Sequence, residues 1–169
     1  MFKGTFKLRH YPNSNTPYMD KVTIKGFFLV GISVRTTNQN GQAMKDIGGL
    51  WNWFISEQVL QQVVNRLSDD IYCVYTDYES DKDGYYTTVL GCQVATKDNI
   101  PEGLICITVP PGDYNRYVAK GALPQAVGET WQQIWTSDID RKYVADFDVY
   151  GERSQSQDDG EVEVFVGVN

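Results

Sequence analysis

The chain has 169 residues, of which 13% are aromatic, and its 15 basic against 22 acidic side chains leave a net charge of −7. This length suits one domain, or two small domains in close contact, with a substantial hydrophobic core. The acidic balance argues against nucleic acid as a partner, because phosphates require a basic face, and more weakly against anionic membrane surfaces. Positively charged ligands or partners fit this charge better.

The first 21 residues are polar and are interrupted by two prolines. We expect residues 1–21 to form an extension, with an extra edge strand at residues 2–9 as an option, ahead of a single domain at 22–169. No apolar run approaches the ~20 residues that a membrane helix needs, and the N-terminus lacks the apolar stretch of a signal peptide.

The cysteines are odd in number and lie in apolar, strand-like surroundings. This pattern indicates small core residues in a reducing compartment, not a disulfide or zinc framework. We therefore expect a cytoplasmic protein in which three thiols stay free: Cys73, Cys92 and Cys106.

From residue 22 onwards, one order of predicted elements occurs twice: strand, helix, strand, strand. We expect module one at about 22–98 and module two at about 103–169. The predicted elements are a strand at 22–38, a helix at 46–67 and strands at 70–80 and 84–96, then a strand at 103–121, a helix at 123–139 and strands at 142–154 and 161–169.

Single residues repeat between the modules as well. The run Ile47-Gly48-x-x-Trp51-x-x-Phe54 matches Val127-Gly128-x-x-Trp131-x-x-Ile134. The strand after each helix also carries two aromatic residues three positions apart, Tyr75 with Tyr78 and Phe147 with Tyr150. A duplicated α+β fold is the better interpretation of these echoes.

Each predicted helix has a start signal. Asp46 is the expected N-cap of the first helix, and Pro124 suits the first turn of the second. Gly48 and Gly49 each cost ~1 kcal/mol against alanine inside a helix. We expect close packing on the sheet to explain them.

Several kinds of chemistry are disfavoured by the sequence. His10, in the polar extension, is the only histidine, which argues against a hydrolytic triad. No glycine-rich phosphate loop and no metal-ligand spacing occur, so we expect no cofactor and no metal. The acidic stretch around residues 77–84 departs from the calcium-loop pattern and fits a hairpin turn at 80–84, with Tyr85 and Tyr86 in cross-strand contacts.

The remaining candidate chemistry is aromatic and acidic. In the predicted strand ADFDVYGE, alternation puts Asp146, Asp148 and Tyr150 on one face, and the end residues can escape to solvent. Asp148 lies mid-strand, and a buried carboxylate is costly without a partner. It pairs either with a tyrosine hydroxyl or an arginine (Arg116 or Arg141) or with a positive ligand, and the sequence leaves both options open.

The motifs IGGLWNWF, YTDYESD, VPPGDYNRYVAKG and DFDVYGE resemble the GyrI-like, AraC-type effector-binding domain family, over roughly residues 22–169. The similarity is closest to its stand-alone members, including those carried on integron gene cassettes. The resemblance implies a pseudo-two-fold pair of β-α-β-β modules that form one antiparallel sheet, with two main helices and a central ligand cleft. Members attached to DNA-binding domains sense lipophilic, often cationic drugs with aromatic walls and an acidic residue.

Two positions depart from the family pattern. The usual Phe-Glu-x-Tyr reads Phe147-Asp148-Val149-Tyr150, which withdraws the charge by one methylene and disfavours a hydrolase that needs the glutamate. Cys73 stands in place of a usual glycine.

We therefore predict a small-molecule binder for lipophilic, cationic compounds that has no direct contact with nucleic acid or membrane. Two alternatives stay open: a hydrolase of electrophilic small molecules, and a protein that modulates a larger enzyme such as gyrase, with a protein partner or homo-oligomer. The acid of the predicted site is Asp148, and its walls are Trp51, Phe54, Tyr75, Trp131, Tyr150 and Tyr117.

Overall fold

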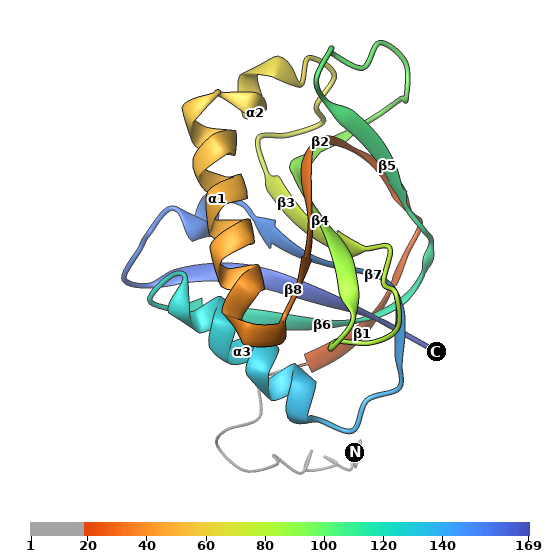
Figure 1. Cartoon of the computed structure of the whole chain (residues 1–169), viewed down its shortest axis with the longest axis vertical. Coiled ribbons are helices and arrows are strands. Elements are labelled where there is room, and N and C mark those ends of the chain that lie inside the picture. Colours follow the sequence, from red (N-terminus) through yellow and green to blue (C-terminus); the bar gives the residue numbers. More distant parts are fainter. Residues whose placement is uncertain (1–18) are drawn as a thin grey trace, which may run out of the picture.

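Eight antiparallel strands form one sheet in this computed structural model, which describes residues 19–169 (Figure 1). The optional edge strand at residues 2–9 lies outside the described residues. The elements in chain order are β1 (Met19–Ile24), β2 (Phe27–Thr37), α1 (Gln42–Ser56), α2 (Val59–Gln62), β3 (Ile71–Thr76), β4 (Tyr85–Val94), β5 (Ile105–Val109), β6 (Gly112–Gly121), α3 (Gln125–Thr136), β7 (Arg141–Tyr150) and β8 (Gly160–Val168).

The strand order β1-β6-β8-β7-β3-β4-β2-β5 confirms the predicted duplication. Module one is β2-α1-β3-β4 and module two is β6-α3-β7-β8, and both follow the expected order of strand, helix, strand, strand. The modules join in the middle of the sheet, where β3 pairs with β7 from Ile71 opposite Tyr150 to Thr76 opposite Ala145. The fold is α+β, as predicted.

The predicted first strand of each module is in fact two strands. Gly26 breaks the first run with φ +83, and Pro110-Pro111 breaks the second, because proline cannot donate a ladder hydrogen bond. The short strands then cross between modules: β1 pairs with β6 of module two, and β5 pairs with β2 of module one. β1 begins at Met19, inside the stretch 1–21 that we expected to precede the domain.

The first helix also differs from the prediction. It begins at Gln42 after Gly41, so Asp46 is not its N-cap; the Asp46 carboxylate accepts a hydrogen bond from the Thr36 hydroxyl at 2.9 Å. The predicted helix at 46–67 ends at Ser56, and α2 follows after Gln58, which has φ +51.

Both long helices cover one face of the sheet, on the near side in Figure 1. Leu50 and Phe54 of α1 pack on module one, and Val127 and Ile134 of α3 pack on module two. The opposite face carries its own core around Phe147, whose ring stacks on Phe165 with centroids 4.6 Å apart. Within residues 19–169, no helix has the length and apolar character that a membrane crossing requires.

Candidate functional site

Asp148 lies on β7 at the join between the two modules. Asp148 is 0% exposed, and it lies opposite Cys73 in the pairing of β7 with β3. Strand alternation turns its side chain to the face that α3 covers, where it meets Trp131. The acid therefore lies at the centre of the sheet under the helices.

Two neutral donors hold the Asp148 carboxylate. The Tyr75 hydroxyl donates to Oδ2 at 2.7 Å, and Trp131 Nε1 donates to Oδ1 at 3.0 Å. Among the described residues no lysine or arginine forms a salt bridge with it. Burial raises the pKa of Asp148 from its ordinary 3.8 to about 7, although both hydrogen bonds act in the opposite direction. Asp148 is thus a buried acid without a counter-charge.

Aromatic rings from both modules surround this acid. Trp51 reaches from α1 of module one to Tyr150 of module two, with ring centroids 4.8 Å apart. Trp131 reaches from α3 of module two to Tyr75 of module one, with centroids 5.3 Å apart. Tyr75 and Tyr150 each border both helix-covered cores. The structure thus gathers five of the seven predicted site residues around one point.

The other two predicted residues lie deeper in the separate cores. Phe54 is 2% exposed on the buried side of α1, and its ring centroid lies 6.3 Å from that of Trp51. Tyr117 is 5% exposed under α3. Their geometry is that of packing residues beneath the helices.

The second acid on this strand contradicts the expectation that end residues reach solvent. Asp146 is 0% exposed. It accepts hydrogen bonds from the Tyr78 hydroxyl at 2.5 Å, from Arg141 Nη2 at 2.8 Å and from the Gly167 amide at 2.8 Å. Asp146 is therefore a fully partnered, ion-paired carboxylate.

The Arg141–Asp146 pair and its link to the aromatic group were not predicted from the sequence. The Arg141 guanidinium carbon lies 4.4 Å from the Tyr143 ring centroid and 5.7 Å from that of Trp131. Arg141 and Asp146 are five residues apart, a spacing that regular alternation assigns to opposite faces. The register shift between them on β7, with Tyr143 at φ +52, brings them together.

Cys73 and Tyr86 also border the group. Tyr86 forms ring contacts with Tyr75 and Tyr78, at 6.0 and 5.6 Å, which confirms its predicted cross-strand role. Burial raises the pKa of the Cys73 thiol, and the negative charge of the neighbouring Asp148 raises this pKa further. The only sequence signal for Cys73 was its replacement of a usual glycine in the family motif.

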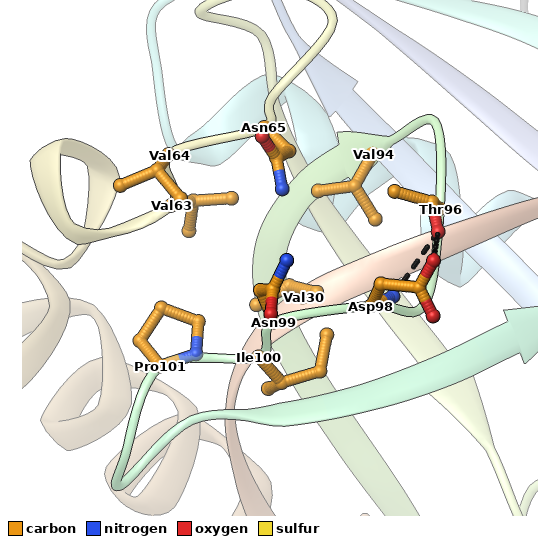
Figure 2. Close-up of a pocket in the computed structure, with 10 residues that line it drawn as sticks. All are labelled: Val30, Val63, Val64, Asn65, Val94, Thr96, Asp98, Asn99, Ile100 and Pro101. Atoms are coloured by element: carbon orange, nitrogen blue, oxygen red, sulfur yellow. Dashed lines mark hydrogen bonds between the residues drawn. The ribbon is translucent and has the colours of Figure 1, made fainter.

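The described surface hollows lie away from this centre. Figure 2 shows one between the α2–β3 and β4–β5 connections, with valine side chains and the Ile100 side chain around it. Its volume of about 10 Å³ admits no more than one water molecule. A second, of about 60 Å³, is lined by residues around Pro110 and Lys142. Neither contains a predicted site residue, and Asp148 itself is fully buried in this structure.

Comparison with known proteins gives one family match and several relatives. The profile of the Cass2 family, described as integron-associated effector binding protein, matches residues 22–168. The integron cassette protein VCH_CASS2 from the mobile metagenome of Vibrio cholerae is 29% identical, with a TM-score of 0.68 over 89% of this chain and 95% of that one. YobU of Bacillus subtilis (strain 168) is 26% identical over 83% of this chain and 91% of its own length.

A third similar protein, SAV2435, was solved bound to tetraphenylphosphonium. It shares the fold with a TM-score of 0.73, over 90% of this chain and 94% of its own, at 19% identity.

Proposed function

The chain belongs to the Cass2 family of integron-associated effector-binding proteins, and from this premise we propose that it binds lipophilic cations against Asp148. The observation that carries the proposal is a carboxylate that is 0% exposed, has a pKa of about 7 and has only neutral hydrogen-bond donors. A buried acid in that state is stabilised in its charged form by a cation.

The surrounding rings suit the same ligand. The rings form two edge-to-face pairs, Trp51 with Tyr150 and Trp131 with Tyr75, whose centroids are 4.8 and 5.3 Å apart. A cation over such a ring gains ~0.5–2 kcal/mol, more when water is excluded. SAV2435, which has this fold, binds tetraphenylphosphonium. An aromatic ligand with a delocalised positive charge is therefore the proposed class.

Binding requires movement of the rings that cover the acid. Trp51 and Tyr150 are half-buried, whereas Trp131 is 8% exposed and tied to Asp148 by its hydrogen bond. We expect Trp51 and Tyr150 to move aside first, because they are more exposed than Trp131 and do not donate the indole hydrogen bond to Asp148. The ligand then exchanges its water shell for the rings and the carboxylate.

The test is a titration with tetraphenylphosphonium that follows tryptophan fluorescence, beside neutral triphenylphosphine oxide. Saturable quenching by the cation is expected. Asp148→Asn keeps the shape of the side chain and removes its charge. It should weaken the binding of the cation by about 2 kcal/mol or more, roughly 30-fold in affinity, and leave the affinity for the neutral compound unchanged. Equal losses for both compounds would refute the role of the charge.

A hydrolase is the second candidate, favoured by one observation. A carboxylate with a pKa of about 7 that is 2.7 Å from the Tyr75 hydroxyl suits general-base chemistry near neutral pH. Turnover of strained electrophiles, abolished by Asp148→Asn, would support this reading over simple binding.

The proposal also includes a cytoplasmic location and no direct contact with nucleic acid. The first is supported by the free thiols of Cys73, Cys92 and Cys106. The second is supported by the net charge of −7.

A further inference from the structure

Three glycines occupy the surfaces of the two long helices without a packing reason. Gly48 and Gly49 belong to α1, and Gly128 belongs to α3. All three are exposed, and a Cβ atom added at any of them would meet nothing within 4 Å beyond its own stretch of helix. The predicted close packing at Gly48 and Gly49 is therefore wrong. Glycine destabilises a helix interior relative to alanine, so packing does not explain why these three positions are glycine.

The two tryptophans show which flanks of the helices face each other. Trp51 leaves α1 toward Tyr150 in module two, and Trp131 leaves α3 toward Tyr75 in module one. Each tryptophan thus points across the join between the modules, where Asp148 lies.

Gly48 and Gly128 lie next to these tryptophan-bearing flanks, on their solvent side. Each precedes its tryptophan, Trp51 or Trp131, by three residues, which is about 60° around the helix on the side away from the buried stripe. Gly49, two residues from Trp51, lies about 160° away from it on the far side of α1. The repeated motif Gly-x-x-Trp therefore occupies equivalent positions on α1 and α3, one on each side of the join between the modules.

Exposed apolar side chains continue the same flanks. On α1, Met44 is 85% exposed and Ile55 is 67% exposed, and both fall within about 40° of Trp51 around the helix. On α3, Trp135 is 37% exposed and follows Trp131 by four residues. Apolar surface concentrated around a buried charge is typical of a site for an amphiphilic ligand.

We propose that Gly48 and Gly128 determine the width of ligand that the site accepts: they keep the facing flanks bare beside Trp51 and Trp131, so that cations with several aryl arms reach Asp148. This inference rests on the proposed function. The aryl arms lie along the bare flanks and contact the exposed apolar side chains, while the charge faces the carboxylate. A narrow cation with a single arm does not need that width.

The experiment compares Gly48→Leu and Gly128→Leu with Gly49→Leu, a matched control on the far side of the same helix. Calorimetric titrations use tetraphenylphosphonium as the wide cation and hexyltrimethylammonium as the narrow one. Leucine favours helix over glycine, so all three variants should melt at or above the temperature of the wild type. A leucine side chain in place of Gly48 or Gly128 should weaken the binding of tetraphenylphosphonium at least about tenfold, with less than about twofold change for the narrow cation.

The control separates this inference from general effects of the substitutions. Gly49→Leu should bind both cations like the wild type. The inference is overturned if tetraphenylphosphonium binds Gly48→Leu and Gly128→Leu as it binds the wild type, or if Gly49→Leu loses as much affinity. A wild-type protein that binds neither cation would instead overturn the proposed function on which the inference rests.

Discussion

Two carboxylates on β7, only two residues apart, have opposite surroundings. Asp146 and Asp148 are both 0% exposed and lie on one face of the strand. Asp146 has Arg141 as a counter-charge, together with a tyrosine hydroxyl and a backbone amide. Asp148 has a tyrosine hydroxyl and an indole N–H, and no cation among the described residues.

The difference shows that burial alone does not mark a binding site. A buried ion pair such as Arg141–Asp146 is internally neutral and serves the fold. A buried acid with only neutral donors keeps a high pKa and remains available to a proton or a ligand. Asp146 therefore has a structural role in the fold, and Asp148, two positions further along the strand, is the acid that we propose for binding.

The largest expected effect is on the structural acid. Asp146→Asn leaves the Arg141 guanidinium buried without its counter-charge, which should lower the free energy of unfolding by about 3–5 kcal/mol. Urea denaturation followed by tryptophan fluorescence measures this change. Asp148→Asn is the matched control and should not be destabilised at pH 8; comparable losses in the two variants would erase the distinction.

A second expectation concerns stability against pH. Because the pKa of Asp148 is about 7 in the folded state and 3.8 ordinarily, the folded state holds its proton more tightly between these values. The free energy of unfolding should therefore fall as pH rises from about 4 to about 7, by about 4 kcal/mol in total. Denaturation of the wild type and Asp148→Asn across this range isolates the contribution, and parallel curves for the two proteins would contradict it.

The affinity for cations depends on the same ionisation of Asp148, but it should rise with pH, whereas the free energy of unfolding falls. With a pKa of about 7, the carboxylate is mostly protonated at pH 6 and mostly charged at pH 8. Tetraphenylphosphonium should bind about tenfold more tightly at pH 8 than at pH 6. Titrations at several pH values measure the midpoint, and an affinity that does not change with pH would count against Asp148 as the cation's partner.

The smallest expected effects come from removing the tyrosine hydroxyl that donates a hydrogen bond to each acid. Tyr75→Phe and Tyr78→Phe each remove one hydroxyl donor from a buried carboxylate and should each cost about 1 kcal/mol of stability or somewhat more. Only Tyr75→Phe should move the pH midpoint of cation binding upward, because its hydrogen bond lowers the pKa of Asp148. A similar shift in Tyr78→Phe would show that the two acids are not independent.

The strand-helix-strand-strand order and its duplication were predictable because they depend on local periodicity and on repeated motifs such as Gly48-x-x-Trp51. The exchange of β1 and β5 between modules was not. Gly26 and Pro110-Pro111 indicate breaks in the strands, but a break does not say which distant strand the freed segment will pair with.

For the proposed site, the sequence predicted which face Asp148 and most of the aromatic side chains occupy, because alternation in β7 and helical spacing fix the direction of each side chain. The sequence did not show that Asp146 has a counter-charge whereas Asp148 has none within residues 19–169. That outcome depends on where Arg141 lies after the irregular stretch at the start of β7, and on Tyr75 and Trp131 arriving from different modules. Such contacts join residues far apart in the chain, so no local pattern encodes them.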